Sequence, residues 1–441
     1  LCTLEICRKS ANFHGKSMLV GFSFKNFRNF KEEQTLSLRA KPAAKERLTW
    51  NAFKTGRKDV PHILKAAAIY GANASGKSNV IRALQVMQQC VLTNTVALPP
   101  PFQPEAFAFD ETSKYEEMSF SVRFIKEEHF YTYEFSVKNH QVAHEALSLK
   151  KERKILLFER TKNDADNSYD YKFGSSLQGQ KKSWSSMTRA DSLFLGTAAA
   201  FNSFQLMPVV EWFADNLLII NAFSRANNLY TIRALEQKRL KKQTLIRFLA
   251  SAGIDIKDIQ IEKEARPGKN ISMNPNAMRD DGEILDIGHI SFVHQFNGKA
   301  WPMSLTDESR GTQHLVELAG PIIDVMKKDA TLIVDDIEAN LHPILIEKLV
   351  QSFFEEADQR NGAQLIFTTN CDALIDNNTN DPDNPLLRRD QIWFVNKNRD
   401  KASNLYVLSD FPIRKNENVR NAYLNGTFDG IPFIEAINVK G

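Results

Sequence analysis

The sequence of 441 residues has little cysteine, no long apolar run and no marked excess of either charge. Its four cysteines, Cys2, Cys7, Cys90 and Cys371, form no CxxC pair, which argues against a disulfide framework or a zinc site and favours a reducing cytoplasm. The longest apolar stretches, such as residues 217–222, are far shorter than the roughly 20 residues that cross a bilayer. The 57 basic and 53 acidic residues leave a net charge of +4, a bias too small to indicate a nucleic-acid partner by itself.

The composition and the length of the chain are those of a folded protein. Hydrophobic residues make up 42% and charged residues 25%, which is ordinary for a water-soluble globular chain, and the length allows two or three packed units. The first 17 residues show no clear periodicity and no secretory signal. Because Met18 opens the first strand-like run, we expect residues 1–17 to be an upstream extension.

Hydrophobic periodicity predicts a strand-rich first part, a helical middle, and a last third in which strands and helices alternate. The basic run at 238–242 fits either a solvated helix face or a contact with nucleic acid or a partner. Trp393 and Tyr423 are expected to pack in the core rather than to stack on a base. Predicted strands lie at residues 19–27, 34–38, 64–70, 118–125, 131–137, 146–149, 155–159, 259–261, 290–294, 331–334, 364–368, 391–395 and 405–408. Predicted helices cover 77–92, most of 187–253 and 314–326, and predicted loops cover 163–185 and the segment from 412 onward.

The most specific motif is the run Gly71-Ala-Asn-Ala-Ser-Gly-Lys77-Ser78, a complete GxxxxGK[ST] loop between a buried strand and an amphipathic helix. Its glycines let backbone N–H groups turn toward phosphate oxygens, and the dipole of the following helix adds to this attraction. We expect Lys77 to reach the outer phosphates and Ser78 to ligate Mg²⁺. The predicted nucleotide-binding residues of the loop are Gly71, Ala72, Asn73, Ala74, Ser75, Gly76, Lys77, Ser78 and Asn79.

A second, acidic motif supplies what such a loop needs to hold a metal ion. Residues 331–336, Thr-Leu-Ile-Val-Asp-Asp, read as an apolar strand that ends in two carboxylates. We expect Asp335 to bind Mg²⁺, directly or through water, and Asp336 to polarise the attacking water. Taken alone, the pattern also fits a strand followed by a helix that Asp336 caps. The GxxxxGK[ST] loop favours the metal site.

Two further segments place polar groups at the ends of predicted elements. Ser309, Gly311 and Thr312 lead into the helix predicted at 314–326, where they either only cap the helix or bind an anion at its N-terminus. Asn370 follows the strand predicted at 364–368, a position from which a switch residue senses the γ-phosphate. Polar residues are common at strand ends, so this position gains meaning only beside the other motifs.

Together these motifs resemble the ABC-class AAA ATPases of bacteria, relatives of the SMC and RecF heads and of the overcoming-lysogenization-defect family. The resemblance extends from Met18 to the end of the chain, and the C-terminal part resembles the branch found in phage-defence and abortive-infection operons. Besides the loop at 71–78, the segments that carry it are Asn26-Phe-Arg-Asn-Phe30, Glu308-Ser-Arg-Gly-Thr312, Asp335-Asp-Ile-Glu-Ala-Asn-Leu-His-Pro343, Thr368-Thr-Asn370, Leu387-Arg-Arg-Asp-Gln-Ile-Trp-Phe394 and Tyr423-Leu-Asn-Gly-Thr-Phe-Asp-Gly-Ile-Pro432.

The resemblance implies an α/β fold, a two-lobed ABC-type P-loop ATPase head with an antiparallel β lobe and a helical insertion, which dimerises around ATP and Mg²⁺. Ser309, Gly311 and Thr312 would then reach the γ-phosphate held by the other subunit. Arg28 would approach the phosphates, unless it is a surface arginine at a strand end. The expected segments are the extension (1–17), an N-terminal ATPase lobe (18–160), a mainly helical insertion (161–258), a C-terminal ATPase lobe (259–411) and a tail (412–441).

The resemblance also implies a partner effector, commonly a nuclease, encoded beside the ATPase. Some members carry a fused Toprim nuclease, for which we expect no room here, so the nuclease would act in trans. Two positions depart from the family pattern: Asp336 stands in place of a catalytic glutamate, and Asn370 replaces a switch histidine and cannot titrate near neutral pH. Both changes weaken water activation. We therefore expect slow hydrolysis and a long-lived ATP dimer, which suits a sensor better than a strand-walking motor.

The sequence thus predicts a cytoplasmic ATPase, catalysing through Lys77, Asp336 and Asn370, that senses a phage component and controls a toxic effector. The alternative is a DNA-repair or chromosome-maintenance ATPase related to the RecF and SMC heads, which would bind nucleic acid directly. Such binding weakens steeply with salt. The near-neutral charge and the lack of a long heptad array count against this alternative.

Overall fold

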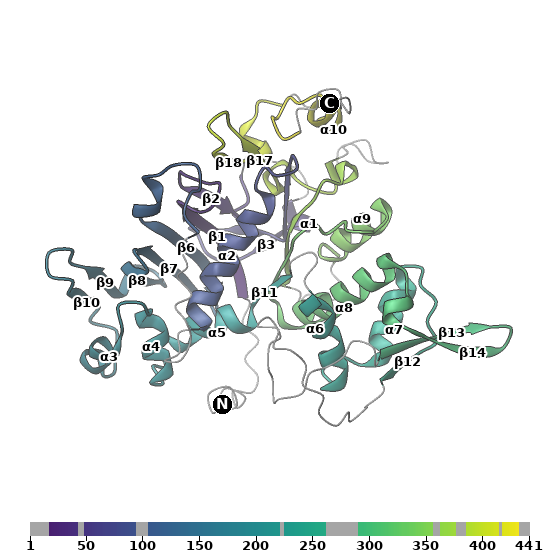
Figure 1. Ribbon diagram of the computed structural model, residues 1–441, viewed down its shortest axis with the longest axis horizontal. Helices are drawn as coiled ribbons and strands as arrows, with labels where there is room; N and C mark the ends of the chain where they lie inside the picture. The colour runs from purple at the N-terminus through teal and green to yellow at the C-terminus, as the bar shows by residue number, and fades with distance from the viewer. Residues whose placement is uncertain are drawn as a thin grey trace.

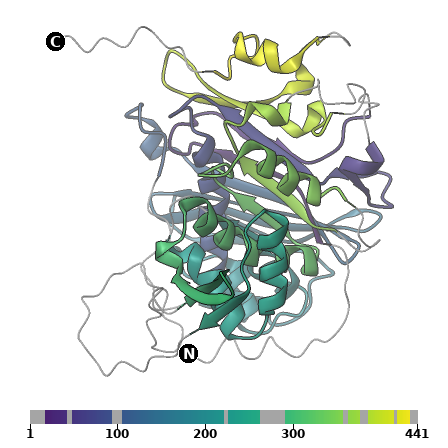
Figure 2. The ribbon, with the colours of Figure 1, turned by 90° about the vertical axis from the view of Figure 1, so that its right-hand side faces the viewer.

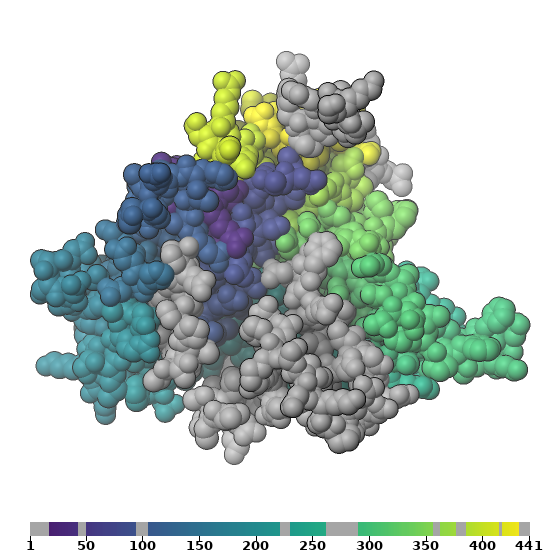
Figure 3. All heavy atoms as spheres, viewed as in Figure 1, coloured from purple at the N-terminus to yellow at the C-terminus, as the bar shows by residue number. Residues whose placement is uncertain are grey.

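The computed structural model describes residues 17–42, 48–93, 105–220, 225–261, 290–355, 362–375, 385–413 and 417–431. Residues 1–16 of the expected upstream extension lie outside these ranges, and Ser17 begins the first strand. The described parts form two packed sheets with a helical lobe beside them, and a narrow arm projects from that lobe (Figure 1). Figure 3 shows the arm standing clear of the body. Within these ranges no helix is long and apolar enough to cross a membrane.

A seven-stranded antiparallel sheet forms the first lobe. Strands β6 and β7 alternate buried and part-exposed residues over most of their length, which is the pattern of a sheet with one face on a core. Phe124 belongs to the buried face and stacks on Trp212 of helix α5, with ring centroids 4.2 Å apart. In order across the sheet, the strands are β10 (Tyr169–Phe173), β9 (Lys154–Lys162), β8 (Gln141–Lys150), β7 (His129–Lys138), β6 (Met118–Lys126), β1 (Ser17–Lys25) and β2 (Gln34–Ser37).

The second sheet has five parallel strands and one antiparallel edge strand, β18. All residues of β5, β15 and β16 are buried, as expected for a sheet covered on both faces. Helix α2 (Lys77–Leu92) and the antiparallel sheet cover one face. Helices α8 (Arg310–Lys328) and α9 (Pro343–Ser352) cover the other (Figure 2). The strand order is β11 (Leu217–Ile220), β15 (Thr331–Val334), β16 (Gln364–Thr368), β5 (Ala66–Gly71), β17 (Ile392–Lys397) and β18 (Ser403–Val407).

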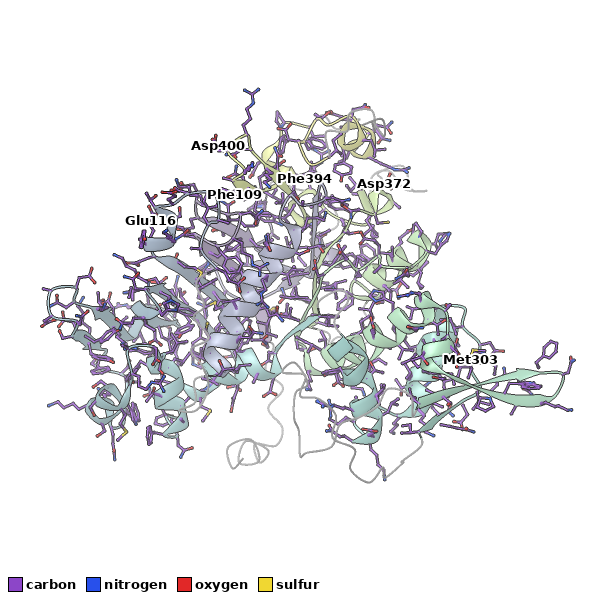
Figure 4. The ribbon with its side chains drawn as sticks, viewed as in Figure 1. Phe109, Glu116, Met303, Asp372, Phe394 and Asp400 are labelled. Carbon is purple, nitrogen blue, oxygen red and sulfur yellow. The ribbon has the colours of Figure 1, made fainter. Side chains whose placement is uncertain are left out.

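Smaller elements complete the fold. The projecting arm is the hairpin of β13 (Ile290–Phe296) and β14 (Lys299–Ser304), which is joined to α8 through the 3-10 turn Leu305–Asp307; Figure 4 labels Met303 on it. Its tip exposes 68% of Phe296 and 56% of Trp301. The arm belongs to the sheet β12 (Asp258–Ile261), β13 (Ile290–Phe296) and β14 (Lys299–Ser304), and β3 (Ala52–Lys54) pairs with β4 (His62–Leu64). The remaining helices are α1 (Leu48–Asn51), α3 (Lys181–Met187), α4 (Phe194–Ala200), α5 (Met207–Asp215), α6 (Arg225–Glu236), α7 (Lys242–Ser251) and α10 (Val419–Leu424).

The structure confirms the predicted α/β fold, with an antiparallel β lobe beside a parallel sheet. The predicted helix at 77–92 and the predicted strands at 331–334 and 364–368 have the observed bounds. Trp393 and Tyr423 are buried, as predicted for packing residues.

Three local predictions are wrong. The loop predicted at 163–185 contains β10, which pairs with β9, and the start of α3. This edge strand has no buried residue, but Tyr169, Tyr171 and Phe173 alternate with Asp170 and Lys172, a strand signal that the prediction of a polar loop overlooked. The helical segment predicted over 187–253 includes β11, a short strand beside β15. The loop predicted from 412 onward contains α10.

Candidate functional site

One cavity of about 1170 Å³ lies where three neighbouring strands of the parallel sheet, β15, β16 and β5, end. Because these strands are parallel, their carboxyl ends meet at the same edge of the sheet. The loop 71–76 follows β5, residues 335–336 follow β15, and residues 369–370 follow β16. The cavity is lined by Arg28, Asn29, Ala72, Asn73, Ala74, Gly76, Lys77, Ser78, Asn79, Glu105, Ala106, Ala108, Phe109, Asp336, Glu338, Ala339, Asn370 and Lys397.

Asn29, whose role the sequence did not reveal, holds the loop 71–76 in place. Its Nδ2 donates to the backbone oxygen of Ser75 at 2.8 Å, and its Oδ1 accepts from Asn79 Nδ2 at 2.7 Å. Gly76 has a φ of 113°, and a Cβ at this position would lie 2.0 Å from Asn29 Nδ2. The left-handed backbone and this close approach both require glycine. The loop is therefore fixed by side chains from outside its own motif.

Lys77 begins α2, and its side chain lies back over the loop. Its Nζ donates to the backbone oxygens of Gly71 at 2.6 Å and Ala72 at 3.3 Å, and to Asn370 Oδ1 at 3.1 Å. The side chain is buried. Burial lowers the pKa of Lys77, although three nearby carboxylates act in the opposite direction. The ammonium is thus held inside the cavity, pointed at the loop and at the end of β16.

The two carboxylates after β15 are held in different ways. Thr368 Oγ1 donates to Asp335 Oδ1 at 2.6 Å and accepts the backbone N–H of Asp336 at 2.7 Å. Asp335 is buried and does not line the cavity, whereas Asp336 does. Burial, followed by the charges of Asp335 and Glu338, raises the pKa of Asp336. The alternative in which Asp336 caps a helix is wrong, because the next helix, α9, has His342 as its N-cap.

Glu338 also lines the cavity, a position that the sequence motifs did not predict. Its Oε1 accepts the backbone N–H of Asn370 at 2.7 Å. Its Oε2 is buried and has no hydrogen-bond partner among the described residues. Buried carboxylate oxygens are normally paired, so this oxygen is an acceptor that a ligand or a cation could satisfy. The available signal was an acidic residue two positions after the pair at the strand end.

Arg28 occupies the wall of the cavity beside the start of α2. Its Nε forms an ion pair with Glu105, and its Nη1 donates to Asn79 Oδ1 at 3.1 Å. The side chain remains 43% exposed. Arg28 therefore meets the first requirement for the predicted phosphate contact, which is access to the cavity.

Ser309, Gly311 and Thr312 do not line the cavity of their own chain. Ser309 Oγ accepts the backbone N–H of Thr312 at 3.1 Å, which makes Ser309 the N-cap of α8. Gly311 lies against the turn after β15, since a Cβ there would be 2.9 Å from the backbone oxygen of Asn340. The cap is confirmed, and the anion contact in a second chain stays a prediction.

The groups around the cavity fit a nucleoside triphosphate with Mg²⁺. The loop 71–76 and Lys77 present donors, and Ser78 lines the cavity as a candidate metal ligand. Asp335 lies just behind the wall, which fits a contact with the metal through water. Among the residues that the structure describes, no cluster of three or more His, Cys, Asp or Glu is arranged to hold a metal. Mg²⁺ on a triphosphate needs no such cluster, because phosphates and waters supply most of its ligands.

A family model described as "AAA domain, putative AbiEii toxin, Type IV TA system" matches residues 66–376. No curated protein gives a significant match.

Among solved structures, the SMC head domain from Thermotoga maritima has 13% identity and a TM-score of 0.39, over 88% of this chain and 98% of that one. An Smc head domain with an extended coiled coil, derived from Pyrococcus furiosus and bound to the C-terminal domain of ScpA, has 11% identity and a TM-score of 0.42, over 93% and 98%. The recombination mediator RecF with ATP has 13% identity and a TM-score of 0.33, over 81% and 93%. These likenesses are too distant to transfer a residue role or a partner.

Proposed function

Since the family match spans most of the chain, the protein belongs to the AAA-domain family described as putative AbiEii toxin of type IV toxin–antitoxin systems, and we propose that it binds ATP with Mg²⁺, dimerises around ATP and regulates a partner effector. One observation carries the proposal. The loop 71–76, the carboxylate of Asp336 and the side chain of Asn370 converge on a single cavity from three neighbouring strands.

Each group around the cavity has a chemical role in this proposal. The phosphates lie against the backbone N–H groups at the N-terminus of α2, and Lys77 offsets their charge. Ser78 and Asp335 hold Mg²⁺, which supplies further positive charge when it is bound. Asp336 polarises the attacking water, and a pKa raised toward the working pH makes its carboxylate a better proton acceptor. Asn370, hydrogen-bonded to Lys77, is the switch residue.

The dimer accounts for the motif that lies outside the cavity of its own chain. Ser309, Gly311 and Thr312 form the N-terminus of the long helix α8, and such an end attracts anions. In our proposal this end completes the site of a second copy by contacting its γ-phosphate. ATP then holds two chains together, and hydrolysis releases them.

Slow turnover distinguishes a sensor from a motor. Asp336 is one methylene shorter than glutamate, and Asn370 cannot exchange a proton near neutral pH. We propose that the ATP dimer persists until a phage component alters it, and that the change releases an effector of the nuclease class supplied by another chain. The description of the family as a putative AbiEii toxin of a type IV toxin–antitoxin system supports a role in such a toxic response.

A mixing experiment tests the shared site. Lys77→Ala and Ser309→Ala should each abolish ATP hydrolysis alone, and mixing the two variants should restore part of it. A heterodimer then contains one site with an intact Lys77 from one chain and an intact Ser309 from the other. Ser304→Ala is the matched control, because Ser304 also caps a short helical turn, accepting from Thr306 at 3.2 Å. No recovery on mixing would contradict a site shared between chains.

Two observations test the effector. Purification of the tagged chain together with the product of the neighbouring reading frame should recover a nuclease or another toxic enzyme. The alternative, a DNA-repair or chromosome-maintenance role, predicts instead that the chain alone binds duplex ends or gaps, with an affinity that falls steeply with salt. Salt-dependent DNA binding without a co-purifying effector would favour that alternative.

A further inference from the structure

A half-exposed aromatic ring lines the same cavity, although its segment of the sequence is separate from the phosphate loop. Phe109 exposes 50% of its surface and belongs to the cavity lining. Several other large apolar side chains are exposed elsewhere among the described residues, and none of them lines this cavity. Phosphate oxygens bind to N–H donors and cations, so phosphate binding does not require an aromatic ring. The position of Phe109 therefore calls for a second kind of ligand group.

The segment that carries Phe109 is anchored rather than loose. Phe107 is buried, and its backbone N–H donates to Asn26 Oδ1 at 3.1 Å. The backbone N–H of Ala108 donates to the backbone oxygen of Arg28 at 2.9 Å. The rings of Phe107 and Phe109 pack edge to face with centroids 5.8 Å apart. These contacts fix the ring of Phe109 at the wall, so its exposure is built into the fold.

Two ammonium groups lie over the ring of Phe109. The ammonium of Lys397 lies 5.1 Å from the ring centroid of Phe109, and that of Lys401 lies 5.4 Å from it. Lys397 also lines the cavity. Lys401 belongs to the turn between β17 and β18. An aromatic face next to ammonium groups suits a flat base joined to an anionic chain.

The size of the cavity agrees with a ligand longer than a triphosphate. Its volume of about 1170 Å³ exceeds the roughly 300–1,000 Å³ of pockets that enclose whole drug-sized ligands. The loop 71–76 and the segment 105–109 both belong to the lining. Arg28 links the segment 105–109 to the start of α2, which directly follows the loop, because it contacts both Glu105 and Asn79. The phosphate-binding loop and the aromatic ring are thus parts of one continuous site.

We propose that Phe109 is the platform on which the base of the nucleotide stacks, with Lys397 beside the ribose and the α-phosphate. The ligand class is a purine nucleoside triphosphate, whose large base covers the exposed ring while its phosphates lie on the loop 71–76. This inference rests on the proposed function and deepens it. It assigns the selection of a nucleotide over inorganic polyphosphate to a residue outside the recognised motifs.

The test compares ATP with inorganic tripolyphosphate, both with Mg²⁺, by calorimetric titration of the full chain. Phe109→Ala should weaken ATP binding by about 5- to 150-fold, the range for loss of one base–aromatic stack, and leave tripolyphosphate binding unchanged. Phe109→Leu should lose ATP affinity as the alanine variant does, whereas Phe109→Trp should keep the ATP affinity of the wild type. Phe204→Ala is the matched control, since Phe204 is 68% exposed and lies outside the cavity lining.

A second readout reports stacking itself. The fluorescence of 2-aminopurine riboside triphosphate should be quenched on binding to the wild-type chain and much less on binding to Phe109→Ala. Equal ATP affinity in the wild type and Phe109→Ala would overturn the proposal. A loss of tripolyphosphate affinity in Phe109→Ala as large as its loss of ATP affinity would also overturn it, because the substitution would then have distorted the loop. If neither ATP nor tripolyphosphate binds the wild type, the proposed function itself fails, and this result is distinct from the other two.

Discussion

Lys77 Nζ donates a hydrogen bond to Asn370 Oδ1 at 3.1 Å, which joins two side chains 293 residues apart in the sequence. The bond forms because β5 and β16 are neighbours in the parallel sheet and end at the same edge. It links the lysine of the phosphate loop to the residue predicted to sense the γ-phosphate. A phosphate oxygen would compete with Asn370 for the same ammonium. Nucleotide binding would therefore weaken the hydrogen bond that Asn370 accepts at the end of β16.

Replacement of Lys77 by alanine should weaken ATP binding by about 10- to 100-fold, the loss expected for a hydrogen bond to a charged group. ATP-dependent dimerisation and any defence phenotype should disappear with it. Calorimetry and size-exclusion chromatography with ATP measure the two effects. Lys172→Ala is the control, because the Lys172 side chain is 73% exposed and pairs with Glu159 on the surface of the antiparallel sheet. Unchanged dimerisation of Lys77→Ala would defeat the mechanism.

Replacement of Asp336 by alanine should trap a dimer loaded with ATP. The loss of a group that polarises water reduces hydrolysis by about 100-fold or more, while the contacts that bind ATP remain. Radiolabelled ATP retained by the dimer fraction on size-exclusion chromatography measures the trapped state. The control is Asp372→Ala, since Asp372 follows the same strand β16 but pairs with Arg420 outside the cavity. A variant that stays monomeric with ATP would show that Asp336 is not the hydrolytic residue.

The phosphate loop could be predicted because everything that identifies it is contiguous. Strand β5, the loop and α2 follow one another over residues 66–92, so strand periodicity, glycine spacing and helix periodicity all act locally. The same holds for β15 and the two aspartates that follow it. Local patterns of this kind are sufficient to predict the loop, the strand and the helix on either side of it and the acidic strand end.

The rest of the site depends on contacts between distant segments. Asn29 reaches Ser75 across 46 residues, and Glu338 reaches the backbone of Asn370 across 32. Phe109 enters the cavity only because its segment is hydrogen-bonded to the turn at Arg28. None of these pairings leaves a periodic signal in the sequence. Sequence patterns predicted the groups that we propose to bear the chemistry, and tertiary contacts show which groups position them.

The raised pKa of Asp336 predicts a stability that depends on pH. Its pKa in the folded chain lies above the ordinary value of 3.8 because of burial, then because of Asp335 and Glu338. As pH rises, Asp336 therefore ionises in the unfolded chain at a lower pH than in the folded chain. Its ionisation lowers the free energy of unfolding as pH rises above 3.8 and through the raised pKa. Asp336→Asn should unfold at a higher temperature than the wild type at neutral pH. This difference should shrink as pH falls through the raised pKa, and thermal unfolding between pH 8 and pH 4 measures it.

Asp59 provides a control of opposite sign for this experiment. Burial alone would raise its pKa, but hydrogen bonds from Lys150 and Arg57 outweigh burial and lower the pKa of Asp59 to about 2. Its ionised form therefore stabilises the fold above pH 3.8, and this contribution is lost only as pH falls toward 2. Asp59→Asn should unfold at a lower temperature than the wild type, by an amount that is constant from pH 8 to pH 4. A lower unfolding temperature for Asp336→Asn at neutral pH would contradict the assignment.

A buried charge network in the antiparallel lobe should dominate the stability of that lobe. Glu145 and Arg160 are fully buried, with Oε2 and Nη1 3.9 Å apart. Glu145 also accepts the backbone N–H groups of Phe194 at 2.6 Å and Leu195 at 2.9 Å, and the hydroxyl of Tyr133 at 3.0 Å. Removal of the carboxylate leaves a buried guanidinium without its counter-charge and the start of α4 without its acceptor. Glu145→Ala should therefore lower the free energy of unfolding by about 3–5 kcal/mol, the cost of breaking a buried pair.

Urea unfolding measures this loss against a matched glutamate. Glu134 lies on the adjacent strand β7, and its side chain is 47% exposed near His144. Glu134→Ala should cost less than about 1 kcal/mol, as is usual for an exposed pair. Glu145→Gln keeps an oxygen for the backbone N–H groups but removes the charge, so its cost should fall between the two alanine variants. If Glu145→Ala costs no more than Glu134→Ala, the network does not anchor α4 to the sheet, and packing of the aromatic core alone must hold that end of the lobe.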